Sequence, residues 1–229
     1  MCTRYYIELS PELRPYIDRA QASPLTARMV AKMGRPLKTE GEVRPTDIAP
    51  VIAPNNSHAP TVYPMVWGFA NPREGGQPLV NSRVETAGFR PFWKESWQRR
   101  RCIIPCSYYF EWEHYMTVKG QKKAGQKYMI QPTGALITYL AGLYAIEERD
   151  GLKYPVFTIL TREPGKEISF IHDRMPVVLG KEYVKNWLDP QSNPAEVVKT
   201  ALTDMYYEKA PQEDDAGFNL EKGRSQTPV

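Results

Sequence analysis

The stretch RCIIPCSYYFEWE, residues 101–113, decides the fold expected for this chain of 229 residues. Its β-branched and aromatic residues predict two strands, over 102–104 and 108–113. Similar runs predict further strands over residues 61–69, 127–131, 136–145 and 154–161, with turn glycines between them. Strands interrupted by short helices are typical of the α+β class. We therefore expect a mostly antiparallel, strongly curved, barrel-like sheet with flanking short helices.

Four short helices are expected around this sheet. Ser23 and Pro24 resemble a helix N-cap and first turn, and Gly34 a C-terminal stop. The other three are expected over 181–188, after the Asn193-Pro194 pair, and around the i, i+4 pair Trp93 and Trp97. The Pro-rich residues 39–60 predict an ordered surface loop. We expect one domain over 1–209 and a mobile tail over 210–229.

Composition limits the function classes. No run approaches the ~18 apolar residues of a membrane span, and the start of the chain lacks the pattern of a secretory signal. The three cysteines, an odd number, argue against a disulfide framework, so we expect a reducing cytoplasmic compartment. The net charge of +4 permits a nucleic-acid partner without requiring one. The basic run Arg99-Arg100-Arg101 is interpreted as a solvent-facing helix end.

Cys2 is the most informative single residue. Cysteine is small enough at position 2 for the initiator methionine to be trimmed away. Trimming would leave a free α-amine and a thiol on adjacent carbons, with pKa values near ~8 and ~8.5. Together these nucleophiles can attack one carbonyl carbon twice and close a five-membered ring. The alternative is a chance cysteine without a role.

Glu111 is a candidate proton donor. In a strand, Tyr109, Glu111 and Glu113 share one face and Tyr108, Phe110 and Trp112 the other. Among so many aromatic residues a carboxyl would be partly desolvated, which raises its pKa and suits it to general acid work. The alternative is a carboxylate on the wet face of a half-exposed strand.

His172 and Asn81 are further candidates. His172 lies in a short polar insert between apolar segments, beside Asp173 and Arg174, where it could serve a site or form a surface ion pair. Asn81 offers an amide donor and acceptor, and Arg83 two residues on is a plausible phosphate ligand. The alternative is an Asn-Ser turn with a surface Arg83–Glu85 network.

A metal site is not expected. Cys102, Cys106 and His114 have the wrong spacing for structural zinc, so the two cysteines are interpreted as buried structural thiols. No P-loop, Gly-rich dinucleotide turn or HExxH helix is present in the sequence. We expect no cofactor.

An ordered set of segments over about residues 1–190 resembles the SRAP family, the "SOS response-associated peptidase" proteins that sense abasic sites in single-stranded DNA. The matching segments are residues 1–5, 45–46, 50–51, 67–69, 81–86, 89–93, 101–105, 109–112 and 172–176, with Thr161 before the last. No single segment is decisive, but the ordered set is specific.

The resemblance implies a chemistry and a role for each residue. The Cys2 amine would condense with the aldehyde of an opened abasic sugar, and the thiol would close a thiazolidine, a stable DNA–protein cross-link that shields the lesion in the DNA damage response. Glu111 matches the family's acid/base residue, and His172 and Asn81 match residues that hold the sugar. The DNA contacts implied are Arg4, Arg83 and Arg174 at flanking phosphates and Thr161 at the lesion. The partner implied is single-stranded DNA carrying an abasic site, bound by a monomer without a membrane, metal or small-molecule cofactor. When bound to DNA, the protein would be associated with the nucleoid.

The sequence also departs from the family pattern. Where members often carry a tryptophan-rich stretch after Phe69, residues 70–76 read ANPREGG. Residues 41–44 replace the usual Tyr-Asn before the proline loop, and the C-terminal Val-Ser segment has no clear counterpart over 203–210. We expect a weaker or differently directed grip on DNA, because base stacking contributes ~1–3 kcal/mol per base.

Two other functions stay open. A thiol autoprotease would use Cys2, Glu111 and His172, as the family name suggests, but a peptidase usually needs a thiolate–imidazole pair and an oxyanion hole. A non-catalytic single-strand binder would use only Arg4, Arg83 and Arg174.

Overall fold

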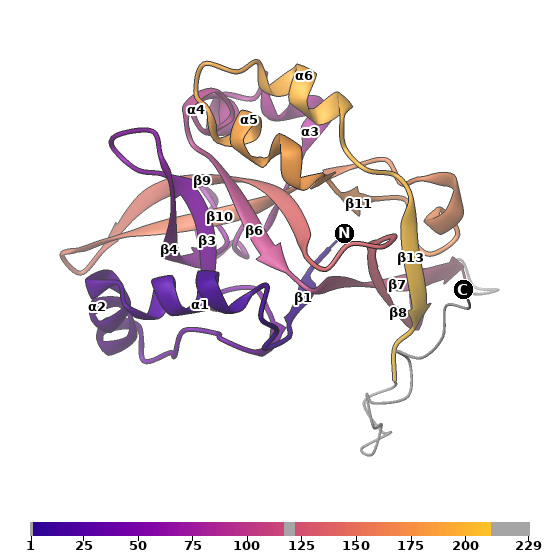
Figure 1. Ribbon diagram of the computed structural model, residues 1–229, viewed down its shortest axis with the longest axis horizontal. Helices are drawn as coiled ribbons and strands as arrows, with labels where there is room; N and C mark the ends of the chain where they lie inside the picture. Colours follow the sequence, from indigo (N-terminus) through magenta and orange to yellow (C-terminus); the bar gives the residue numbers. More distant parts are fainter. Residues whose placement is uncertain (1, 117–121, 212–229) are drawn as a thin grey trace.

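The computed structural model describes residues 2–116 and 122–211, and its short helices flank two sheets (Figure 1). The α+β class is therefore confirmed. The strands are β1 Arg4–Ile7, β2 Gly41–Val43, β3 Ile48–Pro54, β4 Pro60–Trp67, β5 Asn81–Arg83, β6 Arg101–Cys106, β7 Tyr108–Met116, β8 Lys122–Pro132, β9 Thr138–Arg149, β10 Leu152–Arg162, β11 Met175–Pro176, β12 Val178–Leu179 and β13 Met205–Lys209. The helices are α1 Arg14–Gln21, α2 Pro24–Met33, α3 Val84–Ala87, α4 Pro91–Arg99, α5 Val184–Leu188 and α6 Pro194–Lys199, with 3-10 turns η1 Lys166–Ile168 and η2 Lys181–Tyr183.

The larger sheet contains a closed barrel. Its strands follow the order β10-β4-β3-β6-β9, and a long antiparallel pairing between β9 and β10 completes the ring. Strand β10 pairs in parallel with β4 and β5, and the other pairings between the named strands of this sheet are antiparallel. The expected barrel-like, mostly antiparallel sheet is confirmed. Helices α1 and α2 lie on one side of the barrel, and α4, α5 and α6 on the other (Figure 1).

A second sheet, in the order β13-β8-β7-β1-β2, extends from the barrel. Strand β6 of the barrel leads directly through Ser107 into β7 of this sheet. The backbone N–H of Ser107 donates to the Tyr6 carbonyl (2.9 Å), which joins the two sheets at β1. One hydrophobic cluster contains Tyr5 and Tyr109 of the second sheet and Phe157 of the barrel. The division into two sheets was not predicted, and Cys2 belongs to the cluster that joins them.

The prediction of a surface loop over residues 39–60 is wrong. Residues 48–54 form β3, a buried central strand of the barrel. Proline is disfavoured in such strands because it lacks an N–H for the ladder. Here Pro50 lies opposite Pro64 and Pro54 opposite Pro60 across β3 and β4, so each proline faces a residue that also lacks the donor.

Three of the four expected helices formed as predicted. Ser23 caps α2 by accepting from Leu25 N–H, and Gly34 ends it with φ 63°, a left-handed conformation that glycine adopts without strain. Asn193 caps α6 in the same manner, and α4 buries Trp93 and Trp97. Residues 181–188 divide into the 3-10 turn η2 and α5. Helix α1 was not predicted, because it buries only Ile17 and Ala20 in an otherwise polar sequence.

The basic run 99–101 was only partly interpreted correctly. Arg99 is exposed, but Arg101 is 2% exposed. Its guanidinium donates to backbone carbonyls at the C-terminal ends of α4 and α5, where cations are favourable, and to one carbonyl in the turn after α5. The acceptors are Trp97 O (2.9 Å), Gln98 O (2.7 Å), Trp187 O (2.7 Å), Ser192 O (3.2 Å) and Asp189 O.

Replacing Arg101 by methionine should therefore destabilise the protein. The variant leaves buried carbonyls unpaired, and each unsatisfied polar group costs about 1–3 kcal/mol. We expect the free energy of unfolding in urea to fall by about 3 kcal/mol or more. Arg99→Met, a matched change on the exposed side of the run, should shift it by less than about 0.5 kcal/mol. Equal effects of the two variants would contradict this role of Arg101.

Other expectations concern the thiols, the tail and the membrane. Cys102 and Cys106 are fully buried free thiols, as predicted. Ala210 is buried and its N–H donates to Lys127 O (2.9 Å), so the packed chain reaches the first residue of the expected tail. Residues 212–229 of that tail lie outside the described residues. Among the helices of the described chain, none has the length and apolar character needed to cross a bilayer.

Candidate functional site

Cys2 lies two residues before the start of β1 and is fully buried in the cluster between the sheets. Asn81 fixes its backbone, because the side-chain amide of Asn81 donates to the Cys2 carbonyl oxygen at 2.8 Å. Asn81 is itself positioned by the parallel pairing of β5 with β10, where it lies opposite Ile159. The two residues, 79 positions apart in the chain, thus meet in the fold.

Glu111 lies on the core-facing side of β7. Strand alternation places it with Tyr109 and opposite Tyr128 of β8, and the residue is 3% exposed. The alternative, in which Glu111 lies on the solvent-exposed face of a strand, is therefore wrong. Burial raises the pKa of the Glu111 carboxyl to about 7. Near neutral pH, this group is present both as an acid that can give a proton and as a base that can accept one.

His172 faces Glu111 from a different part of the chain. It is buried, and its Nε2 lies 4.0 Å from Glu111 Oε1. Its Nδ1 lies 2.9 Å from the backbone nitrogen of Arg174 and 2.7 Å from Asp173 Oδ1. These two contacts need different protonation states of the His172 ring. An unprotonated Nδ1 accepts from the Arg174 N–H, whereas a protonated Nδ1 pairs with the Asp173 carboxylate. The first state leaves the proton of a neutral ring on Nε2, toward Glu111. The ring of His172 is buried and so does not lie on the surface, although it does pair with the exposed carboxylate of Asp173.

His114 also belongs to the site, although the sequence did not predict it there. Its ring centroid lies 4.4 Å from that of His172. Regular alternation would place His114 with Trp112, on the face opposite Glu111. A register shift between Trp112 and His114 turns it instead toward His172, as β-bulges often do beside functional sites. No sequence signal marks this bulge, and His114 was considered only as a metal ligand.

The thiol of Cys2 is electrostatically unusual. Burial raises its pKa, and the nearby Glu111 carboxylate raises it further. A thiolate nucleophile requires the opposite shift. The thiol is therefore neutral at physiological pH, and a reaction at Cys2 must not depend on preformed thiolate.

Three predicted DNA contacts gather at the end of β10. Thr161 is fully buried and lies opposite Arg83 of β5 in the parallel register. Arg174 donates to the Thr161 carbonyl oxygen (2.6 Å) and forms a two-pronged ion pair with Glu85, at 2.8 and 2.9 Å. The partner of Glu85 is thus Arg174 and not Arg83, as the alternative of an Arg83–Glu85 network had it. The side chain of Arg83 is exposed.

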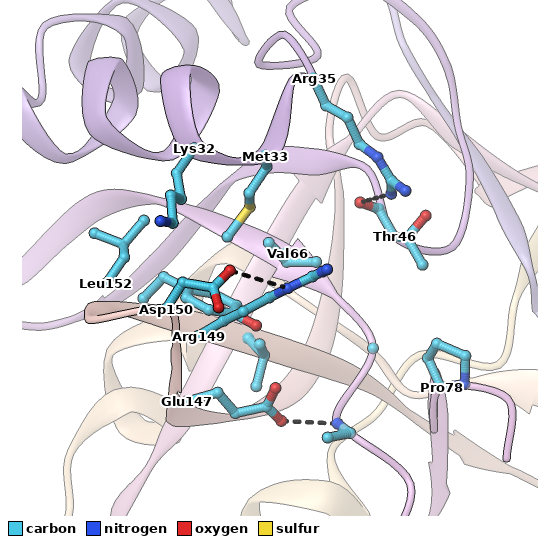
Figure 2. Close-up of a pocket in the computed structure, with 14 residues that line it drawn as sticks. Lys32, Met33, Arg35, Thr46, Val66, Pro78, Glu147, Arg149, Asp150 and Leu152 are labelled. Atoms are coloured by element: carbon cyan, nitrogen blue, oxygen red, sulfur yellow. Dashed lines mark hydrogen bonds and ion pairs between the residues drawn. The ribbon is translucent and has the colours of Figure 1, made fainter. Parts of the chain in front are cut away.

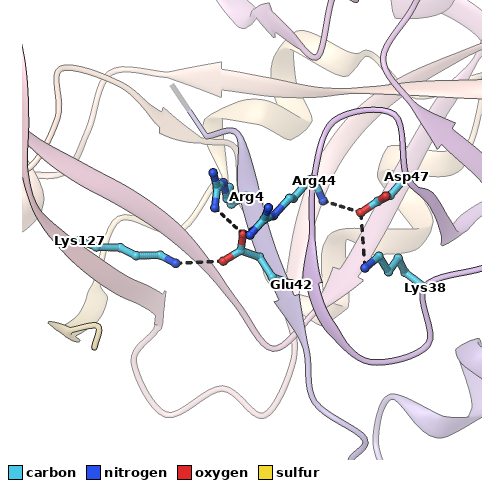
Figure 3. Close-up of polar contacts among 6 residues, drawn as sticks. All are labelled: Arg4, Lys38, Glu42, Arg44, Asp47 and Lys127. Atoms are coloured by element: carbon cyan, nitrogen blue, oxygen red, sulfur yellow. Dashed lines mark hydrogen bonds and ion pairs between the residues drawn. The ribbon is translucent and has the colours of Figure 1, made fainter. Parts of the chain in front are cut away.

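Arg4 lies on the other face of the second sheet. It pairs with Phe110, the neighbour of Glu111, and therefore projects away from the Glu111 side. Its guanidinium lies 5.4 Å from the Trp112 ring and 2.7 Å from Glu42 Oε1. Glu42 also holds Arg44 (2.8 Å) and Lys127 (2.9 Å), so one carboxylate gathers three cations (Figure 3). Although burial opposes it, these contacts lower the pKa of Glu42.

A cavity of about 280 Å³ lies elsewhere, between the end of α2 and the β9–β10 hairpin (Figure 2). Its wall includes Lys32, Arg35, Glu147 and Arg149, but none of Cys2, Asn81, Glu111 or His172. The side chains of the candidate site thus lie in the region between the two sheets and do not line this cavity. Among the described residues, no cluster of His, Cys, Asp and Glu side chains is suited to hold a metal ion.

Known proteins resemble this chain in sequence. The model of the family described as SOS response associated peptidase (SRAP) matches residues 1–213. The chain is 30% identical over 142 residues to the abasic site processing protein YoaM of Bacillus subtilis, covering 59% of this chain and 60% of YoaM. It is 30% identical over 140 residues to the abasic site processing protein YedK of Escherichia coli, covering 61% of this chain and 60% of YedK. The matches thus span about 60% of these relatives.

The fold is also found in solved structures. A protein from Bacteroides thetaiotaomicron superimposes with a TM-score of 0.68 at 20% identity, and the match covers 92% of both chains. This likeness concerns the fold, while the family model covers nearly the whole sequence. The chain belongs to the SRAP family.

Proposed function

We propose that this protein captures abasic sites in single-stranded DNA by forming a thiazolidine between Cys2 and the lesion, after removal of Met1. The observation that carries the proposal is the hydrogen bond from Asn81 to the Cys2 carbonyl, which holds the future N-terminal residue in a buried site close to the Glu111 carboxyl. The names of the relatives, abasic site processing proteins, support a lesion of this kind as the substrate.

The proposed reaction begins at the amine. The abasic sugar opens from its hemiacetal to an aldehyde at C1′. The α-amine of Cys2 adds to this carbon and the carbinolamine loses water, which leaves an imine. The Cys2 sulfur then bonds to the same carbon, and the thiol proton passes to the nitrogen. One water is released overall. The raised pKa of the thiol supports this order, because a neutral thiol is a poor first nucleophile but can add to an activated imine.

Glu111 and His172 supply the proton transfers in this scheme. The carboxyl, with a pKa of about 7, can protonate the ring oxygen as the sugar opens and then the departing hydroxyl of the carbinolamine. His172, 4.0 Å from Glu111, is placed to contact the sugar and to exchange a proton with the carboxyl. Thr161, Arg83 and Arg174 would contact the lesion and its flanking phosphates at the end of β10.

A denaturing gel tests the proposal. The full chain is incubated with a single-stranded oligonucleotide containing one abasic site, and in parallel with the intact oligonucleotide. We expect a slower band that survives denaturation only with the abasic strand. A non-covalent binder would shift both strands on a native gel and neither on a denaturing gel, and that result would contradict the proposal.

Glu42 provides a separate prediction about DNA affinity. Its carboxylate pairs with Arg4 and two further cations on the outer face of the second sheet and offsets part of their charge. Glu42→Gln should release positive charge toward DNA phosphates, so we expect roughly 5-fold tighter binding of single-stranded DNA at low salt. The slope of log K against log salt should also become steeper. The measurement is fluorescence anisotropy over a salt series.

Glu40→Gln is the matched control. It changes the net charge equally, but Glu40 is exposed, two residues before Glu42. We expect a smaller gain in affinity from this variant. Equal gains would show that only the net charge of the protein sets the DNA affinity. The cations paired with Glu42 would then have no specific part in binding.

A further inference from the structure

Three aromatic rings form a cluster at the edge of the second sheet. Tyr128 of β8, Tyr207 of β13 and Phe170, which follows η1, contact one another edge to face. The centroid distances are 5.7 Å for Tyr128–Phe170, 6.0 Å for Tyr128–Tyr207 and 5.4 Å for Phe170–Tyr207. Tyr128 is buried, whereas Tyr207 is 37% and Phe170 48% exposed. The cluster therefore leads from the protein interior to solvent.

The cluster begins at the candidate site. Tyr128 lies directly opposite Glu111 in the β7–β8 register, so both side chains share the core-facing side. Phe170 precedes His172 by two residues, a span of at most about 7 Å along the chain. The backbone N–H of His114 donates to the Ile171 carbonyl (3.2 Å), which ties the segment between Phe170 and His172 to β7. The exposed rings are thus held at a fixed place beside Glu111 and His172.

Exposed aromatic rings on a rigid support are suited to stack on nucleobases, whatever their sequence. This chain has ANPREGG over residues 70–76 and no aromatic residue there. A strand whose abasic sugar lies at Glu111 and His172 must place a neighbouring nucleotide close by. We propose that Phe170 and Tyr207 form a stacking platform for the base next to the lesion. This inference rests on the proposed function and adds a base-binding subsite to it.

The test uses oligonucleotides that cannot react. Each carries a tetrahydrofuran abasic analogue, which has no aldehyde, so only non-covalent affinity is measured. One oligonucleotide has adenine on both sides of the analogue, and the other has further tetrahydrofuran spacers there. We expect Phe170→Ala and Tyr207→Ala each to weaken binding of the adenine-flanked strand roughly 5- to 50-fold and to leave the spacer-flanked strand within about 2-fold. Phe170→Trp should retain or improve the affinity.

Tyr206→Ala is the matched control. Tyr206 is 47% exposed on the same strand but projects to the other face of the sheet. It should leave both affinities unchanged. Equal losses on both oligonucleotides, or no loss for either platform variant, would overturn the stacking platform. The cross-linking gel with a true abasic strand is read separately, so the platform can fail while lesion capture stands.

Discussion

Replacing Cys2 by alanine is expected to abolish the covalent DNA adduct completely. The variant still has a small second residue, so Met1 can be removed and an α-amine remains. That amine can form an imine with the aldehyde, but no sulfur is present to close the ring. We therefore expect no band on a denaturing gel unless borohydride is added to reduce the imine. Cys2→Ser should likewise give no stable product.

The matched control for this loss is Cys106→Ala. Cys106 is another fully buried thiol of the same cluster, but nothing in the proposed reaction uses it. It should keep its cross-linking activity, with at most a modest loss of stability. An adduct that persists in Cys2→Ala without reductant would show that another residue carries the reaction.

Replacing Glu111 by glutamine should slow adduct formation by about 100-fold or more, which is the usual contribution of a general acid. The amide keeps the shape of the side chain but cannot donate a proton to the sugar oxygen. The wild-type rate should pass through a maximum between about pH 7 and 8 and decline above it, because the α-amine must lose its proton to add while the Glu111 carboxyl, with a pKa of about 7, must keep its own. In Glu111→Gln this decline should disappear. Single-turnover rates with abasic DNA over a pH series measure both effects.

Glu111→Gln should also be more stable than the wild type at pH 8. Its slower adduct formation could then not result from misfolding. Burial raises the folded-state pKa of Glu111 above its unfolded value, so folding takes up a proton between about pH 4.5 and 7. The wild type therefore loses stability as pH rises through this range, by on the order of 3 kcal/mol. Glutamine has no proton to lose. A variant less stable than the wild type at pH 8 would contradict the buried, protonatable carboxyl.

Local patterns predicted much of the fold. Capping residues marked α2 and α6, and β-branched and aromatic runs marked the main barrel strands. Strand β3 was missed because its prolines argue against a central strand, and only the pairing of Pro50 with Pro64 and of Pro54 with Pro60 removes that objection. That pairing depends on the register between two strands, which single-residue preferences do not contain.

The contacts within the site could not be predicted from local sequence preferences either. Strand alternation correctly grouped Glu111 with Tyr109, but the contact of Glu111 with His172 joins residues from distant segments. The position of His114 depends on a bulge without a sequence signal. The partner of Arg174 is Glu85, which lies 89 residues away, and not a neighbour in the sequence. Family resemblance supplied Glu111, His172 and Arg174 as candidates, whereas their contacts, and the place of His114, required the fold.

The buried thiol also separates the two catalytic hypotheses. A thiol peptidase depends on a thiolate, usually paired with an imidazole. Burial and Glu111 both raise the pKa of Cys2, which opposes thiolate formation. A mechanism in which the amine attacks first does not have this requirement. The electrostatics of the site therefore favour capture of an aldehyde over hydrolysis of a peptide bond.

The intact mass of the purified adduct, alkylated with iodoacetamide after denaturation, tests ring formation at Cys2 most directly. We expect the mass of the chain without Met1 plus the abasic oligonucleotide minus one water. An imine would have this same mass, so the thiols decide between the two. Of the three cysteines, only Cys102 and Cys106 should then be alkylated, because the Cys2 sulfur is in the ring. An adduct that retains Met1, or one in which all three cysteines are alkylated, would contradict the thiazolidine.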